Sequence, residues 1–286
     1  EIDWLVEPAY APIPRLHANV ARVVPLAWRR WRRRLWSAST WRSLAQARHE
    51  LRRRRYDLVL DLQGLLKSAL WARQAQAPLA GYDRASVREP LAAWLYQKVA
   101  AVPRELHAID RCRQLAALHL GYPLPRQPPR FGLSVPPAAW RPTAPYAVLI
   151  PNASRAAKLW PERRWVVVGQ RLARAGWLPI VLWGSEAEQT LAERIAAGCE
   201  GDVPPFLAVG EMAALLAQAR LVVGLDTGFT HLAAAVGRPT IGIYCDHEPG
   251  LAGLVGPGPV SSLGGKGSVP AQAEVLARVE EELARG

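Results

Sequence analysis

LVVGLDTGFTHLAAA, the sequence of residues 221–235, decides the fold of this chain. Its apolar beginning predicts a strand buried on both faces, as in a parallel sheet. Asp226, Thr227 and Gly228 then turn the chain directly into a helix, predicted over 229–236. A strand that passes at once into a helix is the repeating unit of an α/β protein. Ligands of such sheets bind beyond the carboxyl ends of the strands.

The turn at residues 226–228 has the chemistry of a binding site for a phosphorylated sugar. A helix N-terminus offers unpaired N–H groups and a partial positive charge to a phosphate. Gly228 allows a ligand close to the backbone, and His231, in the first helical turn, could reach a phosphate. Asp226 could accept hydrogen bonds from sugar hydroxyls. The alternative is that Asp226 and Thr227 only cap the helix, and spacing alone does not decide between the two.

Two other segments also join a predicted strand to a predicted helix. Residues 150–162, IPNASRAAKLWPE, place Ser154 and then Lys158 where small polar groups and a cation could cradle a phosphate. The alternative is a solvated loop with an exposed lysine. Residues 182–188, LWGSEAE, place Glu188 where its carboxylate could hold a ribose diol. A glutamate in the first turn of a helix is also ordinary helix-dipole chemistry.

Strands and helices alternate along the chain on both sides of the proline-dense segment 123–145. This alternation predicts right-handed βαβ units with parallel sheets, arranged as two doubly wound domains with a cleft between them. Strands are predicted at 2–6, 56–61, 146–150, 178–183, 221–225 and 240–244, and helices at 64–72, 108–120, 161–176, 186–197, 212–219, 229–236 and 271–285.

The composition excludes several classes of protein. A length of 286 residues predicts about two domains, and 50% hydrophobic residues supply packed cores. The 36 Lys and Arg against 24 Asp and Glu give a net charge of +12, which favours acidic partners such as phosphates, nucleic acid or an anionic membrane surface. The three cysteines form no CxxC pair, which argues against a disulfide framework or a zinc site. No apolar run approaches the ~18 residues of a membrane-spanning helix, and no signal peptide is recognised.

A basic and aromatic segment occupies residues 25–34. If it is helical, Trp28, Trp31 and Leu35 share one face and arginines occupy the rest. Tryptophan anchors at a membrane interface, and clustered arginine binds anionic headgroups. The alternatives are a solvated basic loop and a nucleic-acid surface, although no helix-turn-helix, RRM or OB pattern accompanies the charges.

Over nearly its whole length the sequence resembles glycosyltransferase family 9. The motif at residues 226–232, DTGFTHL, is specific for that family. The other matching segments are WRRWRR at 28–33, DLQGLLKSA at 61–69, REPLA at 88–92, HAIDR at 107–111 and KLWPE at 158–162.

The resemblance implies a GT-B fold, which is an α/β fold of two doubly wound, Rossmann-like domains facing a cleft. It implies an acceptor-binding domain at residues 1–135, a linker at 136–145 and a nucleotide-sugar-binding domain with a closing helix at 146–286. It also places a strand and a loop, which carry the Asp that serves as general base, before Glu1. No residue of this sequence matches that Asp, so we expect these 286 residues to bind nucleotide sugar weakly without turnover.

The implied reaction is transfer of L-glycero-D-manno-heptose from ADP-heptose to Kdo of Kdo-lipid A, with inversion and without a metal or other cofactor. We therefore expect a monomer, peripheral on the inner face of a Gram-negative cytoplasmic membrane, with no nucleic-acid partner. An alternative is a family member that adds a later heptose. A non-catalytic protein that binds nucleic acid or an anionic surface is the alternative from another class.

The resemblance also assigns roles to residues. It implies that Lys158, the catalytic residue expected in this chain, binds the diphosphate together with the Thr227–Gly228 turn. It also implies that Glu188 binds the ribose and that Asp226 binds the heptose. Two loops depart from the family pattern, PNAS at 151–154 and CDHEP at 245–249. The implied donor-binding residues are Ser154, Lys158, Glu188, Asp226, Thr227, Gly228 and His231, and the implied acceptor-binding residues are Arg29, Arg30, Arg32, Arg33, Arg88, His107 and Arg111.

Overall fold

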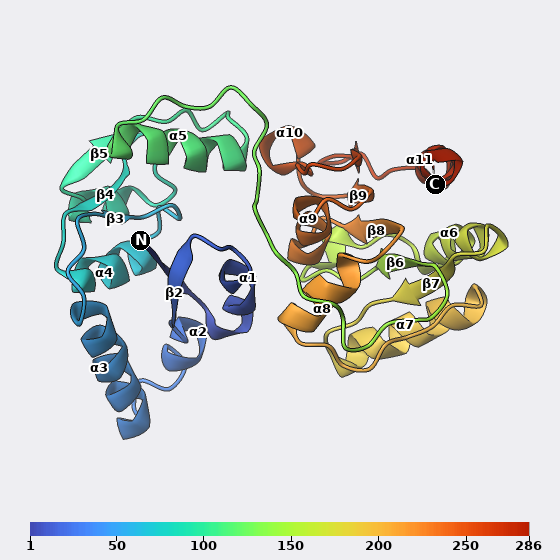
Figure 1. Ribbon diagram of the computed structural model, residues 1–286, viewed down its shortest axis with the longest axis horizontal. Coiled ribbons are helices and arrows are strands. Elements are labelled where there is room, and N and C mark those ends of the chain that lie inside the picture. The colour runs from blue at the N-terminus through green and yellow to red at the C-terminus, as the bar shows by residue number, and fades with distance from the viewer. Residues whose placement is uncertain (286) are drawn as a thin grey trace. The chain divides into compact units, whose positions relative to one another are not determined.

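The computed structural model describes residues 1–285, and these form two compact units (Figure 1). The first unit contains Glu1–Arg15 and Asn19–Gln127, and the second contains Leu16–Ala18 and the chain from Pro128 onward. Most of the proline-dense segment therefore associates with the second unit, and the division falls near residue 127 rather than within 136–145.

The second unit contains a five-stranded sheet in which every neighbouring pair is parallel, in the order β10-β9-β8-β6-β7. The strands β6, β8 and β9 are buried at every residue, as expected for continuous apolar runs in a sheet covered on both faces. The strand bounds are β6 (Tyr146–Ile150), β7 (Leu178–Val181), β8 (Leu221–Leu225), β9 (Thr240–Tyr244) and β10 (Val260–Gly264).

Helices follow the strands of this sheet. Buried side chains of α6, α7 and α11 form one hydrophobic core with the strands, and α8 packs against α9, which contacts β8 and β9. The bounds are α6 (Glu162–Arg174), α7 (Glu186–Gly198), α8 (Val209–Leu216), α9 (Gly228–Ala235), α10 (Pro249–Ala252) and α11 (Gln272–Arg285), with a 3-10 turn η4 (Ala156–Lys158) after β6.

The first unit contains two separate parallel sheets. One pairs β1 (Ile2–Val6) with β2 (Val20–Pro25), and the other has the order β3 (Val59–Leu60), β4 (Leu79–Tyr82), β5 (Lys98–Ala100). The remaining elements are α1 (Pro12–Arg15), α2 (Trp28–Trp31), α3 (Ala38–Arg52), α4 (Leu66–Ala72) and α5 (Ala108–Leu120), with 3-10 turns η1 (Pro8–Tyr10), η2 (Arg73–Ala75) and η3 (Pro90–Leu95).

A polar cluster links β1 and β2 to Tyr56, in the segment that follows α3. Arg22 donates from Nε to Asp3 over 2.9 Å and from its terminal nitrogen to the Tyr56 hydroxyl over 2.7 Å. Tyr56 donates in turn to Asp3 over 2.8 Å. Burial and the adjacent Asp3 carboxylate raise the pKa of Tyr56, so the phenol stays protonated and continues to donate.

The predicted α/β fold with parallel sheets is confirmed. Several elements differ from their predicted extents. The strand predicted at 56–61 is the two-residue β3, and the strand predicted at 178–183 ends at Val181. Strands β2, β4, β5 and β10 were not predicted.

The predicted stripe is confirmed for Trp28 and Trp31, which lie on α2 and both contact Trp71, and is wrong for Leu35, which lies beyond the helix. Helix α2 is a single turn that ends at Trp31, and only 5% of the Trp31 side chain is exposed. The centroid of the Trp31 ring lies 5.6 Å from that of Trp71 on α4. The two indoles pack together in the hydrophobic cluster between α2 and α4. The tryptophan that projects into solvent in this region is Trp36, which is 99% exposed.

Within residues 1–285, no helix has the length and apolar character needed to cross a membrane.

Candidate active site

Three loops leave adjacent strands at the carboxyl edge of the second unit's sheet. Strand β6 leads to Lys158, its neighbour β8 leads to Asp226, and its other neighbour β7 leads to Glu188. In a parallel sheet this edge is where ligands bind, because the helices that follow the strands point their N-termini toward it.

Lys158, Asp226 and His231 are in direct contact. Nζ of Lys158 lies 2.5 Å from Oδ2 of Asp226 and donates to its backbone carbonyl over 3.2 Å. Nε2 of His231 lies 3.2 Å from Oδ1 of the same carboxylate. The Lys158 and Asp226 side chains are only 17% and 12% exposed. Each carboxylate oxygen of Asp226 therefore has a cationic or polar partner within the site.

The protonation of Asp226 follows from these contacts. Burial alone would raise the pKa of its carboxyl, but hydrogen bonds from His231 and Lys158, with the positive charge of Lys158, lower the pKa to about 2. The carboxylate is therefore ionised throughout the neutral range and can only accept hydrogen bonds.

The turn after Asp226 leaves the start of α9 accessible. Thr227 is the N-cap residue, but its side chain makes no capping hydrogen bond, and the carboxylate of Asp226 is held by Lys158 and His231. The interpretation that these two residues only cap the helix does not describe this structure. Apart from the adjacent residues and the backbone of α9 itself, no atom lies within 4 Å of the position that a Cβ would take on Gly228, so a ligand can approach the backbone there.

The sequence did not indicate the role of Thr230, whose buried side chain stabilises this turn. Its buried hydroxyl donates to the Leu225 carbonyl over 2.6 Å and lies 3.3 Å from the Thr227 hydroxyl. Gly224 accommodates it, because a Cβ on that residue would lie 2.3 Å from the Thr230 hydroxyl oxygen. The feature of the sequence that could have indicated this role is the position of Thr230, a hydroxyl residue in an otherwise mostly apolar helix, three residues after the N-cap.

Glu188 and Ser154 lie apart from this three-residue contact. Glu188 accepts a hydrogen bond from the Gly184 backbone over 2.8 Å, closing the turn between β7 and α7. Ser154 is exposed in the loop after β6. In the same loop Arg155 forms an ion pair of 3.0 Å with Asp246, which follows β9, a contact that the sequence did not suggest.

In the first unit, the carboxyl edge of the β3-β4-β5 sheet is organised by a buried carboxylate. Asp61 accepts hydrogen bonds from the backbones of Gln63 and Gly64 over 2.9 and 3.2 Å. Its other oxygen accepts from the hydroxyls of Ser68 and Tyr96, each over 2.8 Å. We call these five residues the Asp61 cluster. Burial, together with the Asp61 charge, raises the pKa of Tyr96, so its phenol remains a donor.

Hydrogen bonds join the Asp61 cluster to the loops after β4 and β5. The backbone of Glu89 donates to the Gly64 carbonyl over 3.0 Å, and its carboxylate accepts from the Leu66 backbone over 2.6 Å. The Ser86 hydroxyl accepts from the Val102 backbone over 2.9 Å. The three loops at this edge are therefore connected.

Three predicted acceptor-binding residues lie on or beside these loops. Arg88 is exposed, and His107 is the N-cap of α5, where its ring nitrogen accepts from the Ile109 backbone over 3.3 Å. The Arg111 side chain already has partners within the protein. It donates to the Ser86 carbonyl over 2.6 Å, and its guanidinium carbon lies 4.8 Å from the centre of the Tyr82 ring.

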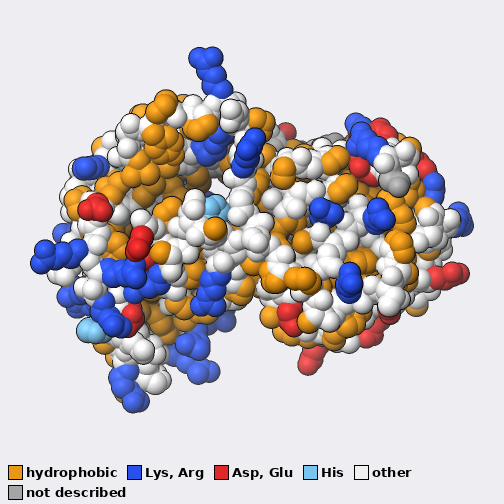
Figure 2. All heavy atoms as spheres, in the orientation of Figure 1, with side chains coloured by type: hydrophobic (Ala, Val, Ile, Leu, Met, Phe, Trp, Pro, Cys, Tyr) orange, Lys and Arg blue, Asp and Glu red, His pale blue; other side chains and the backbone are white. Residues whose placement is uncertain are grey.

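The arginines of the 28–33 segment extend into solvent. Arg29, Arg30, Arg32 and Arg33 are all exposed, and none has a side-chain ion pair among the described residues. Residues 1–127 carry 22 Lys and Arg against 10 Asp and Glu, whereas residues 128–286 carry 14 of each. The whole net charge therefore belongs to the first unit, and Figure 2 shows basic side chains gathered over it.

Within the described part of the chain, no three His, Cys, Asp or Glu side chains are grouped so that they could hold a metal ion.

Comparison with known proteins places this site in a family. The sequence pattern of the family described as "Glycosyltransferase family 9 (heptosyltransferase)" matches residues 28–272, which include the loops of both sheet edges. The chain belongs to glycosyltransferase family 9. The resemblance found in the sequence is thereby confirmed.

Curated relatives of this family 9 glycosyltransferase match most of its length. Lipopolysaccharide heptosyltransferase 1 of Pseudomonas aeruginosa is 43% identical over 262 residues, which cover 90% of this chain and 73% of the relative. The protein of the same name from Escherichia coli K12 is 38% identical over 260 residues, covering 90% and 82%.

Solved structures of family members have a similar fold. Escherichia coli heptosyltransferase WaaC with ADP is 36% identical with a TM-score of 0.88, over 98% of this chain and 89% of that chain. The same enzyme with ADP-2-deoxy-2-fluoro heptose is 34% identical with a TM-score of 0.85 over the same shares. The predicted GT-B fold class of this family 9 glycosyltransferase is therefore confirmed.

Proposed function

We propose that this family 9 glycosyltransferase transfers L-glycero-D-manno-heptose from ADP-heptose to Kdo of Kdo-lipid A, with inversion, in the synthesis of the lipopolysaccharide inner core. The observation that carries the proposal is the contact of Lys158, Asp226 and His231 at the carboxyl edge of the second sheet. It occurs in a chain 43% identical to a lipopolysaccharide heptosyltransferase 1.

The donor would be held by the loops that follow β6, β7 and β8. Lys158 supplies a cation for the diphosphate beside the open backbone of Thr227 and Gly228 at the start of α9. Asp226 is an ionised acceptor suited to the heptose hydroxyls. Glu188 would hold the ribose by giving up its hydrogen bond from the Gly184 backbone.

Lys158 would also assist the chemistry. In glycosyl transfer from a nucleotide sugar, negative charge grows on the diphosphate as its bond to the sugar breaks. A fixed ammonium in a partly buried site stabilises that charge without reorganising solvent. No described residue is assigned as the general base.

The acceptor would bind the first unit. Kdo carries a carboxylate and lipid A carries phosphates, and the first unit holds all of the net positive charge. Arginine pairs with both kinds of anion in bidentate geometry. Arg29, Arg30, Arg32 and Arg33 are exposed and available for this role. Arg88 and His107 lie at the sheet edge, and Arg111 would take part by exchanging its hydrogen bond to the Ser86 carbonyl.

We further propose that the enzyme works as a monomer, peripheral on the inner face of a Gram-negative cytoplasmic membrane. The support is the cationic first unit, with the exposed Trp36 beside its arginines, because cations attract anionic headgroups and an indole inserts at the interface.

Two measurements test the function. Calorimetric titration with ADP-heptose should show binding by the unchanged protein and none by Asp226→Ala, with the exposed Asp202→Ala as a control that keeps it. Mass spectrometry should then show heptose added to Kdo-terminated lipid A by the intact protein expressed from its complete gene. Addition only to a heptose-bearing core would indicate a family member that acts later, and no ADP-heptose binding would contradict both.

A further inference from the structure

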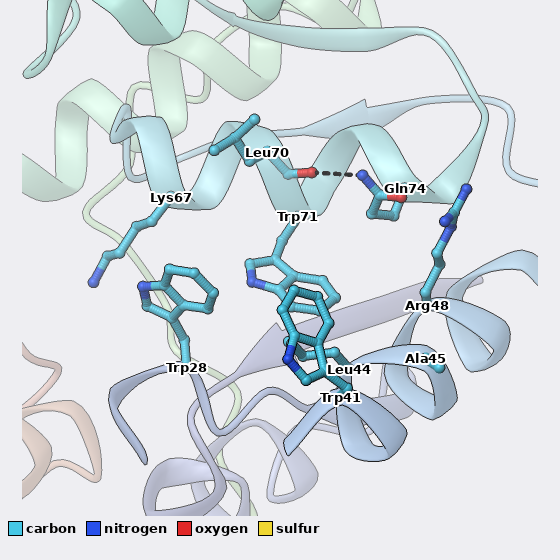
Figure 3. A pocket seen from close by; sticks show the side chains of 9 residues that line it. All are labelled: Trp28, Trp41, Leu44, Ala45, Arg48, Lys67, Leu70, Trp71 and Gln74. Carbon is cyan, nitrogen blue, oxygen red and sulfur yellow. Dashed lines mark hydrogen bonds between the residues drawn. The ribbon is translucent and has the colours of Figure 1, made fainter. Parts of the chain in front are cut away.

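A pocket of about 340 Å³ lies between α2, α3 and α4 in the first unit, outside the loops described above. Three indole rings and two leucines, Leu44 and Leu70, are among the nine residues that line it. Trp28 comes from α2, Trp41 from α3, and Leu70 and Trp71 from α4 (Figure 3). Exposed Trp41 and Leu70 leave a substantial apolar surface in contact with water, which is characteristic of a binding surface.

Two polar groups of the lining are engaged within the protein. The Trp41 indole N–H donates to the Leu35 carbonyl over 2.8 Å. The Gln74 amide donates to the Leu70 carbonyl over 3.2 Å, the bond drawn in Figure 3. The indole, leucine and alanine side chains that make up most of the lining offer no hydrogen-bond acceptor to a sugar or a peptide. A hydrocarbon chain, which requires none, suits the pocket.

Two cations stand at opposite ends of this apolar lining. Figure 3 shows Lys67 at the end near Trp28, and Arg48 at the other end near Gln74. Both side chains are exposed, and neither forms an ion pair or a side-chain hydrogen bond with another residue in 1–285. An apolar pocket with an unpaired cation, Lys67, at the end near the acceptor edge is complementary to a lipid that carries negative charge where its hydrocarbon begins.

The pocket begins next to the proposed acceptor edge. Lys67 is the second residue of α4, directly after the loop that Asp61 holds at the carboxyl end of β3. The adjacent Leu66 backbone is bonded to Glu89, the neighbour of Arg88. From Lys67 the lining follows α4 away from this edge, through Leu70 and Trp71.

We propose that this pocket receives one acyl chain of the lipid acceptor, with Lys67, at the end next to the acceptor edge, pairing with an anionic group from which the chain extends. The proposal rests on the proposed function, because it takes the sugar end of the acceptor to lie at the edge marked by Arg88. It assigns to the acceptor's hydrocarbon a site on the protein, in addition to the one that its sugar occupies.

The test compares two acceptors that share the Kdo-bearing sugar, one acylated and one fully deacylated. Leu70→Gln places a neutral amide in the wall of the pocket, at a side chain that is 47% exposed and therefore dispensable for folding. In the intact protein we expect KM for the acylated acceptor to rise about tenfold, the factor that loss of a leucine-sized apolar contact produces. The KM values for the deacylated acceptor and for ADP-heptose should stay within about twofold.

Leu118→Gln is the matched control, because Leu118 is a 54% exposed leucine on α5 that does not line the pocket. It should leave all three KM values unchanged. An equal rise of KM for both acceptors in Leu70→Gln, or no rise for either, overturns the proposal. So does a loss of binding to phospholipid vesicles with an unchanged KM for the acylated acceptor, which would assign the pocket to a bilayer lipid.

Failure of the proposed function has a different signature. In that case the unchanged protein transfers heptose to neither acceptor. Binding of a fluorescent medium-chain fatty acid, measured on the same proteins, then reports on the pocket alone. Binding that is lost in Leu70→Gln and kept in Leu118→Gln supports a hydrocarbon site, and absence of binding to the unchanged protein contradicts it.

Discussion

Lys158 and Asp226 lie 2.5 Å apart, although they belong to loops that follow different strands, and His231 contacts the other oxygen of the same carboxylate. The cation proposed to receive the diphosphate is thus already neutralised before a ligand arrives. A donor must offer Lys158 a better anion and must offer Asp226 new hydrogen-bond donors. ADP-heptose can do both, through its diphosphate and its sugar hydroxyls.

The first prediction concerns the pH dependence of stability. The pKa of Asp226 is about 2 in the folded protein, against an ordinary value of 3.8. Because the folded pKa is lowered, its contribution is complete above pH 3.8 and is lost as pH falls toward 2. The difference corresponds to at most about 2 kcal/mol. Asp226→Asn should lower the free energy of unfolding by up to that amount at neutral pH. Denaturant titrations should find the two proteins converging near pH 2, and a constant difference would contradict this.

The second prediction concerns the role of Lys158. Lys158→Gln should weaken ADP binding by about 10- to 100-fold, because a charge-assisted hydrogen bond is worth about 1.5–3 kcal/mol. Adenosine, which has no phosphate, should bind the variant and the unchanged protein equally. Arg155→Gln, which removes the other cation paired across this sheet edge, serves as the control and should change ADP affinity by less than about threefold. Equal losses for adenosine and ADP would exclude a phosphate contact.

The third prediction concerns the basic segment. Replacing Arg29, Arg30, Arg32 and Arg33 with Gln should raise KM for the acceptor while leaving ADP-heptose affinity unchanged, because these residues and Asp226 belong to different units. The four side chains are exposed, so each contributes less than a buried contact. The effect on KM should shrink as salt rises, since exposed charges are screened over about 10 Å at 0.1 M.

A control for this variant comes from the second unit. Arg163→Gln with Arg174→Gln removes two exposed arginines that are distant in sequence from the segment. It should leave acceptor KM unchanged at every salt concentration. If the four-site variant instead lowered ADP-heptose affinity, the assignment of acceptor and donor to the two units would be wrong.

The fourth prediction separates two tryptophans. Trp31 is buried against Trp71, so Trp31→Ala should destabilise the first unit by about 3–5 kcal/mol. Trp36 is almost fully exposed, so Trp36→Ala should leave the free energy of unfolding within about 0.5 kcal/mol. Trp36→Ala should nevertheless weaken binding to vesicles with anionic headgroups, with little dependence on salt, because apolar insertion is not screened. Unchanged vesicle binding would remove Trp36 from the proposed membrane contact.

Elements with strong local signals could be predicted from the sequence almost residue by residue. Strands β6, β8 and β9 are continuous apolar runs, and α5 ends where Gly121 adopts a positive φ of 72°. Strands β4 and β5 have four and three residues, too few for any periodicity to show. Strand β10 includes two serines, so it lacked the apolar run that marked its neighbours.

In the candidate site too, features set by the sheet topology could be predicted, whereas contacts that depend on side-chain direction could not. Parallel topology brings Lys158 and Asp226 to one sheet edge, and the sequence predicted that edge. The contact between His231 and Asp226 was not predicted, because it depends on the side-chain direction in the first turn of α9. Trp28 and Trp31 share the face that their spacing predicted. Trp71, which contacts both rings, comes from a helix that no local pattern connects to them, so their burial was not predicted.

The Asp61 cluster gives the first unit a property that belongs to no single loop. One buried carboxylate takes four hydrogen bonds, and two more bonds pass from its loop to Glu89. None of these loops can open alone without leaving a charged oxygen or a backbone amide unpaired. Their amide protons should therefore exchange with solvent in one cooperative event rather than one loop at a time.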